Sequence, residues 1–423
     1  GKEEKIPYVL LPPFHTTVTA QIQVTLSADG EFLGASKVGS EDKLTIIPVT
    51  EKSGSRTAGK APHPLCDNLR YLAGDYGRYV QDKKEDVGSY YKLYMEELEK
   101  WHLSPFSHEK VNAVWNYLKK GTLIQDLLKE KILLQSEAGC LTEDVKIEGV
   151  AQSMAFVRFI VRGKAGIKSG QTCDECWKDS SLWDCFIQYY RSIEGEKELD
   201  YLTGGMQTAS YLHSKKIRNE GDGAKLISSN DESNFTFRGR FATKEQAFAI
   251  GNETSQKMHN ALKWIIRKQG RNFDTLTMVT WESDMKEMPP WDADTETISS
   301  AAASDMVPEP EKDDLQALFQ DELPEGWKEE LEDDFVSDGN PMTARQFYSA
   351  LEGYRKQVEN TSRMILLAFD AATTGRLSLA EFKMMETSKY LDNIRKWHDQ
   401  CGWIQRKYKE GHRKSYYDVP GVR

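Results

Sequence analysis

The sequence predicts a predominantly helical α+β fold, with a β-hairpin in the N-terminal region, a mixed α/β central domain and a C-terminal helical segment. Three observations support this prediction: β-branched runs near the start, apolar residues at three- and four-residue steps through the middle, and 39% hydrophobic residues in a chain of 423. Such a chain can bury a substantial core and form two or three domains. We place a β-rich N-terminal region at residues 1–64, a mixed helical and strand central domain at 65–288, an acidic linker-like segment at 289–340 and a C-terminal helical region at 341–423.

The N-terminal region is expected to form strands followed by a loop. Residues 18–26 are rich in β-branched side chains, and the Asp-Gly pair at 29–30 is a typical hairpin turn. A second β-rich run at 44–49 leads into residues 52–62, whose glycines and small residues predict an exposed basic loop. The cations of this loop could contact a phosphate, and a merely disordered loop explains them equally well. These cations are Arg56 and Lys60.

Helical spacing dominates the central domain. Apolar residues recur at three- and four-residue steps between Val87 and Leu134, and a helix also fits residues 181–193. Residues 156–162 predict a strand that ends at a glycine, and residues 276–281 predict a second, buried strand.

The best-defined helix is expected to run from Thr243, which forms a capping box with Gln246, to Gln269, with Gly270 as its stop. Its inward face is expected to carry Ile250, Thr254, Met258, Ala261 and Ile265. Its other face carries Gln256, Asn260, Lys263 and Arg267. Amide side chains can read purine edges and cations neutralise phosphates, so this polar face is a candidate nucleic-acid contact; a solvated helix surface is the alternative.

Aromatic residues and arginines alternate around Gly239 in the run from Phe235 to Phe241. In a strand, Arg238 and Arg240 could reach a nucleic-acid backbone while the aromatic rings pack inward. An amphipathic edge strand with solvated arginines fits the same pattern.

The net charge of −10 is distributed unevenly. Between residues 282 and 334, nineteen acidic residues and three lysines give a local charge of −16, which leaves +6 for the rest of the chain. Residues 289–310 are a linker candidate, and amphipathic helices are expected at 341–358 and 391–408. A basic remainder joined to an acidic segment is compatible with nucleic-acid binding in one part of the chain.

Signals for catalysis or metal binding are weak. Cys173 and Cys176 form a lone C-x-x-C that could hold zinc with Cys185 and His213, but ordinary thiols are the preferred interpretation. Residues 370–381 imitate a calcium loop yet lack acids at its third and fifth positions, so a Gly-centred turn is expected there. Phosphate-binding loops are absent from the sequence and the eight histidines are scattered, so we expect neither catalysis nor a cofactor.

The compartment is expected to be the cytoplasm. Six unevenly spaced cysteines favour reduced thiols. The sequence contains neither a secretory leader nor a run near the roughly 18 apolar residues that a membrane span requires. The chain begins at Gly1 rather than Met, which suggests trimming.

Five segments of the sequence, taken together, indicate a family resemblance. They are His63–Asp75, Phe235–Phe241, Ser255–Gly270, Ala372–Ser378, and Trp397-His398 with Trp403. In their sequence and order they resemble the large-subunit family of the type I-C CRISPR surveillance complex, called Cascade, over roughly residues 15–408. That family is usually longer and closes with a region similar to its small subunit, so we expect this chain to be truncated at Arg423.

By that resemblance, the protein would bind guide crRNA near its 5′ handle, beside the backbone subunits, the 5′-handle-capping subunit and the small subunit. It would inspect the protospacer-adjacent motif in target double-stranded DNA, help to unwind it, and recruit a helicase-nuclease that cleaves. A pure assembly subunit and an enzyme whose site forms only in the fold are the alternatives. The candidate nucleic-acid-binding residues are Arg56, Lys60, Asn68, Arg238, Arg240, Gln256, Asn260, Lys263, Arg267 and Arg271.

Overall fold

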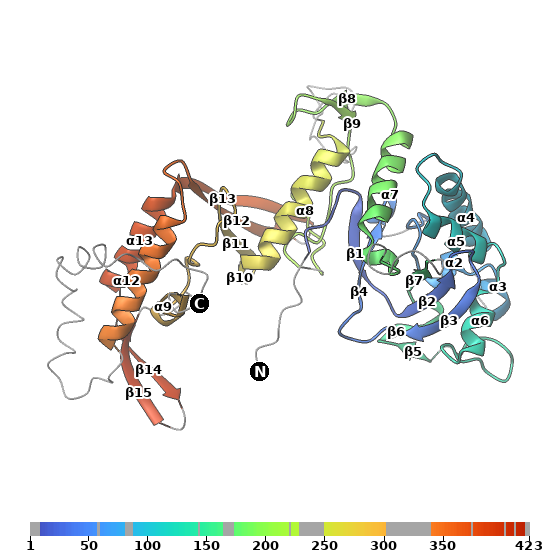
Figure 1. Cartoon of the computed structure of the whole chain (residues 1–423), viewed down its shortest axis with the longest axis horizontal. Helices are drawn as coiled ribbons and strands as arrows, with labels where there is room; N and C mark the ends of the chain where they lie inside the picture. The colour runs from blue at the N-terminus through green and yellow to red at the C-terminus, as the bar shows by residue number, and fades with distance from the viewer. Residues whose placement is uncertain are drawn as a thin grey trace. The chain divides into compact units, whose positions relative to one another are not determined.

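The protein has an α+β fold, as the sequence predicts (Figure 1). The structure is a computed structural model that describes residues 9–56, 60–80, 88–142, 144–163, 173–219, 221–227, 249–301, 340–373, 375–401, 403–409 and 412–418. The chain divides into two compact units, which we call the N-terminal unit (residues 8–217 and 227–264) and the C-terminal unit (residues 218–226 and 265–423).

A three-stranded sheet organises the N-terminal unit. β2 pairs antiparallel with β3 and parallel with β7, while β1 and β4 form a separate antiparallel pair. The predicted hairpin is confirmed: Gly30 has φ +85°, and a Cβ there would lie 2.5 Å from the carbonyl oxygen of Ala113. The strands of this unit are β1 (His15–Thr19), β2 (Ile22–Ser27), β3 (Phe32–Lys37), β4 (Leu44–Pro48), β5 (Lys146–Ile147), β6 (Val150–Ala151), β7 (Val157–Arg162), β8 (Lys197–Leu199) and β9 (Met206–Thr208).

Helices α2 to α7 of the N-terminal unit pack apolar side chains into one core with the sheet, and the helical spacing read from the sequence is confirmed. Tyr94, Leu98 and Trp101 of α4 are buried, as are Val111 and Val114 of α5. The helices are α1 (Glu51–Gly54), α2 (Leu69–Leu72), α3 (Tyr76–Tyr79), α4 (Gly88–His102), α5 (Glu109–Leu118), α6 (Leu123–Lys129), α7 (Ser180–Ile193) and α8 (Asn252–Gln269), with 3-10 turns η1 (Gln152–Met154) and η2 (Cys176–Lys178).

The expectation of an unpacked loop over residues 52–62 is wrong at its start. Residues 51–54 form α1, because the Thr50 side chain accepts a hydrogen bond from the Ser53 amide and the Ser53 hydroxyl accepts one from the Thr50 amide. Ser53 is buried, while Lys52 and Lys60 are exposed as expected.

Helix α8 begins at Asn252, and the predicted capping box of Thr243 with Gln246 lies outside the described residues. Residues 249–251 are not helical, and Gly251 bridges to Ala209. The predicted stop is confirmed, since α8 ends at Gln269 and a Cβ on Gly270 would lie 2.5 Å from the Ile266 carbonyl oxygen.

A four-stranded antiparallel sheet, in the order β10–β11–β12–β13, organises the C-terminal unit. The predicted turn in residues 370–381 is confirmed, because Gly375 lies between β12 and β13. The predicted helix at 391–408 is too long: α13 ends at Cys401, and residues 403–409 pair with 412–418 as a hairpin. The elements are β10 (Arg271–Phe273), β11 (Leu276–Glu282), α9 (Thr295–Ala301), α12 (Asn340–Lys356), β12 (Arg363–Thr373), β13 (Arg376–Glu386), α13 (Thr387–Cys401), β14 (Trp403–Lys409) and β15 (His412–Asp418).

Among the described residues, no helix has the length and apolar character needed to span a bilayer. None of the six cysteines, all of which the structure describes, forms a disulfide.

Candidate nucleic-acid interface

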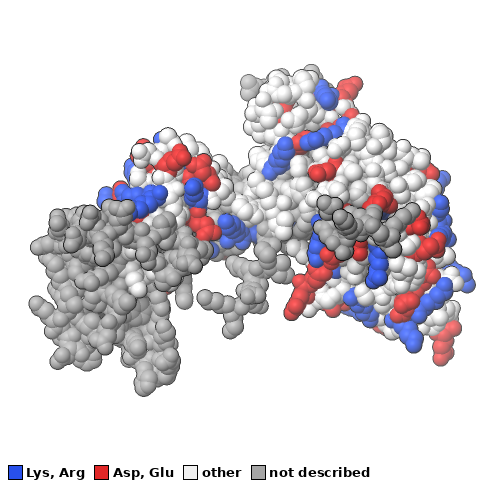
Figure 2. Space-filling view, in the orientation of Figure 1, with Lys and Arg blue, Asp and Glu red and all other residues white. Residues whose placement is uncertain are grey.

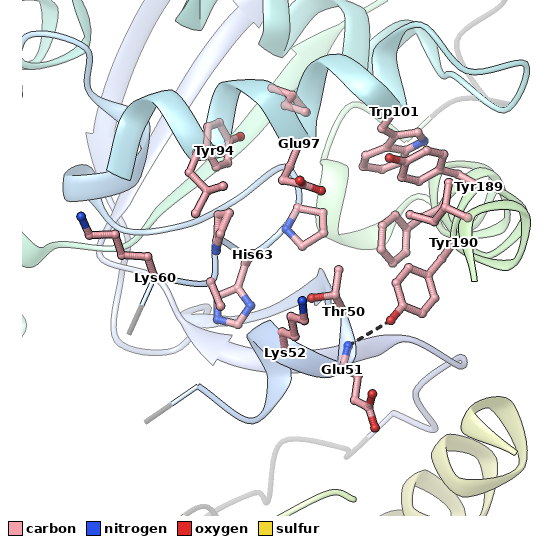
Figure 3. Close-up of a pocket in the computed structure, with 17 residues that line it drawn as sticks. Thr50, Glu51, Lys52, Lys60, His63, Tyr94, Glu97, Trp101, Tyr189 and Tyr190 are labelled. Atoms are coloured by element: carbon pink, nitrogen blue, oxygen red, sulfur yellow. Dashed lines mark hydrogen bonds between the residues drawn. The ribbon is translucent and has the colours of Figure 1, made fainter. Parts of the chain in front are cut away.

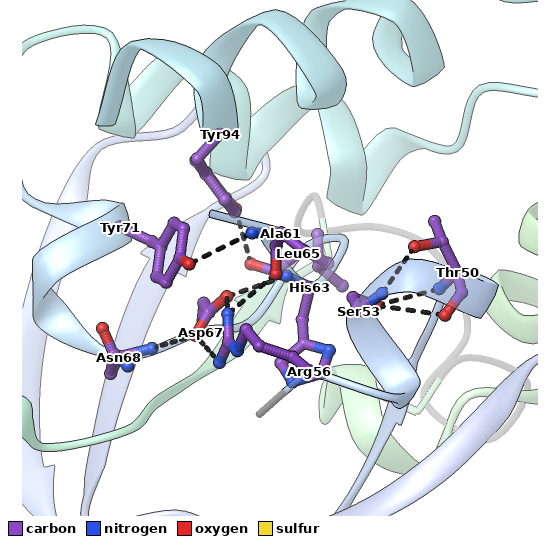
Figure 4. A network of polar contacts seen from close by, with 10 residues as sticks. All are labelled: Thr50, Ser53, Arg56, Ala61, His63, Leu65, Asp67, Asn68, Tyr71 and Tyr94. Carbon is purple, nitrogen blue, oxygen red and sulfur yellow. Dashed lines mark hydrogen bonds and ion pairs between the residues drawn. The ribbon is translucent and has the colours of Figure 1, made fainter. Parts of the chain in front are cut away.

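Arg56 is held by a buried carboxylate rather than projecting into solvent (Figure 4). Its Nη1 and Nη2 lie 2.9 and 3.0 Å from Oδ2 and Oδ1 of Asp67, and Nη1 also donates to the Ala61 carbonyl at 2.9 Å. The guanidinium lies 4.8 Å from the ring centroid of Tyr71. Burial lowers the pKa of Arg56, but the hydrogen bonds and charge of Asp67 outweigh it and raise that pKa overall. The positive charge of Arg56 is therefore compensated within the protein.

Asp67 also fixes the chain around it. Its side chain is fully buried and accepts hydrogen bonds from the backbone amides of His63 and Asn68, both at 2.8 Å. Asn68 occupies the N-cap position of α2 and is half-buried. Because one carboxylate binds Arg56 and two backbone amides, it ties the segment from Ala61 to Asn68 to the end of α1.

A pocket of about 320 Å³ lies beside this network, between α1, residues 60–64, α4 and α7 (Figure 3). Five aromatic side chains contribute to its lining. They are Tyr94, Trp101, Phe186, Tyr189 and Tyr190. Lys52 and Lys60 also line it and are exposed, so they form part of its rim. The Lys60 Nζ lies 4.8 Å from the Tyr90 ring centroid and donates to Ser89.

His63 lines the same pocket and is neutral at pH 7. It is 8% exposed, and burial lowers its pKa to about 4. Its Nδ1 has no hydrogen-bond partner among the described residues.

Two carboxylates belong to the pocket lining, and they differ in role. Glu51 directs its carboxylate away from the pocket in Figure 3, and Oε1 accepts from the amides of Tyr211 and Leu212, both at 2.8 Å. Glu97 lies among the lining side chains and pairs with Lys100 at 2.7 Å. Glu97 is therefore the carboxylate available to a bound molecule.

The expectation that α8 presents a solvent-exposed polar face is wrong for two of its four residues. Asn260 is 2% exposed, and its Nδ2 donates to the carbonyl oxygens of Leu11 and Pro12 at 3.3 and 3.1 Å. Lys263 is 8% exposed. The physical reason is that the amide of Asn260 satisfies main-chain carbonyls of a distant segment, so this face turns inward.

Three other predicted site residues are described, and they are not among the residues that line the pocket. Arg267 donates to the Arg218 carbonyl, and Arg271 pairs with Asp292 at 2.6 Å, all within the C-terminal unit. Gln256 is half-buried on α8. Arg238 and Arg240 lie outside the described residues.

Of the predicted residues, the structure brings together Arg56, Lys60 and Asn68. The sequence analysis missed Lys52, His63 and the aromatic lining as site residues. Tyr94 and Trp101 belong to the helical pattern between Val87 and Leu134, which predicts core positions, and no local pattern indicates that α1, α4 and α7 converge on one space.

Cations elsewhere do not gather on the face shown in Figure 2, where lysines and arginines are interspersed with acidic side chains over the described surface. Within the described parts of the chain, no group of three His, Cys, Asp or Glu side chains is arranged to hold a metal ion. His213, the fourth zinc ligand considered from sequence, forms a 2.8 Å hydrogen bond with Ser255.

One comparison with known proteins identifies a family. The family described as CRISPR-associated protein (Cas_Csd1) matches residues 1–420, which include both compact units. No curated protein matches the chain.

Proposed function

This chain belongs to the CRISPR-associated Csd1 family, and we propose from that membership that it is the large subunit of an RNA-guided type I-C Cascade complex. In this role it lies near the 5′ handle of the guide crRNA, reads the protospacer-adjacent motif in target double-stranded DNA and helps to unwind the duplex. It then recruits the helicase-nuclease, which performs the cleavage. We propose a cytoplasmic complex and no catalytic role for this chain.

The observation that carries the proposal is the family match over residues 1–420. The pocket adds local support, because it combines exposed lysines with aromatic walls, and proteins that bind unpaired nucleic acid use cations for phosphates and aromatic rings for bases. Lys52 and Lys60 are thus the described cations that we assign to nucleic acid.

The proposal is tested by assembling the full chain with guide crRNA and the other complex subunits. Duplex DNA that carries or lacks the motif is then titrated, with photo-crosslinking to identify the contacted subunits. We expect motif-dependent binding and crosslinks from DNA to this chain. A complex that assembles on RNA while its DNA crosslinks fall only on other subunits would instead support a pure assembly role.

The enzyme alternative needs a separate measurement. Under this alternative, the isolated chain has metal-dependent nuclease or nucleotide-hydrolysing activity. That activity must return after the chain is denatured and refolded, since this control excludes activity from a contaminating protein. No specific observation favours this alternative.

A further inference from the structure

We propose that the pocket between α1, residues 60–64, α4 and α7 binds a single nucleotide, with its base against the aromatic wall and its phosphate at Lys52 and Lys60. The inference rests on the proposed nucleic-acid function and adds the ligand class and the place where it binds.

The pocket has the size of a small-ligand site. Its volume of about 320 Å³ is at the lower end of the range for such sites, about 300–1,000 Å³. A site of this size suits one nucleotide and is too small for a duplex. A nucleotide from a strand must therefore be unpaired and turned out of the stack before it enters.

The wall of the pocket is aromatic. Trp101 and Tyr189 are nearly parallel, with ring centroids 5.9 Å apart and planes at 14°, and Phe186 meets Trp101 edge-on at 5.0 Å. Because Trp101 and Phe186 are each 1% exposed and Tyr189 is 5% exposed, these rings offer edges of fixed orientation to a ligand rather than a free face. A base packs against these edges by apolar contact, which does not discriminate between bases.

The rim supplies the charge that a phosphate needs. Lys52 and Lys60 are exposed, and Lys60 is positioned over the Tyr90 ring. Arg56 is not part of this charge, since Asp67 binds its guanidinium with two hydrogen bonds. Its contribution is indirect: the Arg56–Asp67 pair holds the segment that carries Lys60 and His63.

One polar side chain determines how a ligand is oriented in the pocket. Glu97, from α4, can accept a hydrogen bond from a base-edge donor, such as an exocyclic amino group or the N3–H of thymine, and repels a phosphate. The phosphate therefore binds at the two lysines and the base points toward Glu97.

The test uses the purified full chain and a short fluorescein-labelled oligothymidylate, followed by anisotropy. Thymidine 5′-monophosphate, thymidine and inorganic phosphate are the competitors. We expect the monophosphate to displace the labelled strand and the other two to be much weaker, because each offers only half of the contacts. Calorimetry measures binding of the monophosphate directly. It shows whether the pocket binds a free nucleotide even when the labelled strand does not bind, and so distinguishes a free nucleotide from a nucleotide within a strand as the ligand.

Pocket variants connect the binding to this place. Lys52→Ala and Lys60→Ala should each weaken binding of the monophosphate about tenfold, as expected for one lost charge-assisted contact. Ile193→Trp, at a 51% exposed position in the lining, should block the pocket without disturbing the core. Lys92→Ala and Leu103→Trp, at exposed positions outside the lining, are the matched controls and should leave binding unchanged.

The outcomes separate this inference from the proposed function. If the strand binds but the monophosphate does not compete and Ile193→Trp has no effect, the pocket assignment is overturned while the proposed function stands. If the monophosphate neither binds nor competes, the assignment is overturned as well. If the monophosphate binds and the pocket variants abolish it, yet the chain does not assemble with guide crRNA, the pocket assignment stands and the proposed function fails.

Discussion

Replacing Asp67 by alanine should destabilise the N-terminal unit more than any change at an exposed ion pair. The variant leaves the charge of Arg56, whose side chain is 19% exposed, without its partner. It also leaves the amides of His63 and Asn68 without their acceptor. Removing one partner of a buried ion pair typically costs about 3–5 kcal/mol. We take about 3–4 kcal/mol here because Arg56 keeps some contact with water.

The measurement is urea unfolding of the full chain, followed by tryptophan fluorescence, with the midpoint and slope compared between variants. Arg56→Met and the double variant complete a double-mutant cycle, and we expect a coupling of roughly 2 kcal/mol. Lys100→Ala is the control, because Lys100 and Glu97 are 62% and 43% exposed and such a pair contributes about 0.5 kcal/mol or less.

A loss below about 1 kcal/mol for Asp67→Ala, or a coupling near zero, would refute the claim that this pair stabilises the N-terminal unit. A stable variant that has lost monophosphate binding would show instead that the pair positions Lys60 without contributing much to folding.

Three further predictions concern the rest of the fold. Asn260→Ala should lower the free energy of unfolding by about 1–3 kcal/mol, because it removes a buried donor from two carbonyls; an unchanged urea midpoint would contradict the inward face of α8. Gly270→Ala should lower the melting temperature, since the new Cβ meets a carbonyl at 2.5 Å, whereas Gly375→Ala, with open space around it, should not. Burial lowers the pKa of His15 and His63 to about 4, below the unfolded value near 6.5, so the unfolded state binds protons first as the pH falls. Stability should therefore be full above pH 6.5 and fall toward pH 4 by up to about 1.4 kcal/mol per pH unit for each histidine, and replacing His63 by glutamine should reduce that slope in urea titrations.

Local patterns in the sequence were sufficient for much of the fold. The helical spacing in α4 and α5, the Asp-Gly turn and the stop at Gly270 each depend on residues close in sequence, and the structure confirms them. The sequence predicts helix where β14 forms a hairpin with β15, because the basic run at 403–409 also suits a helix and its strand partner lies further along the chain.

The site was less predictable because its decisive partners are distant. The sequence predicts Asn260 to be a surface residue, but in the fold its side chain donates a hydrogen bond to the carbonyl of Leu11, 249 positions away. The sequence makes Arg56 a candidate phosphate ligand, but in the fold its guanidinium binds the carboxylate of Asp67. Polarity in a sequence indicates which groups need partners, but only the fold determines whether water, protein or a ligand provides them.

The most direct test of the account is crosslinking mass spectrometry of the assembled complex, with guide crRNA and target double-stranded DNA carrying a photoreactive base. The account predicts that nucleic acid crosslinks to peptides of this chain that line the pocket, including those with Lys60 and Tyr189, and that Ile193→Trp removes these crosslinks while the complex still assembles. A fully assembled, DNA-bound complex with no crosslink to these peptides would contradict it.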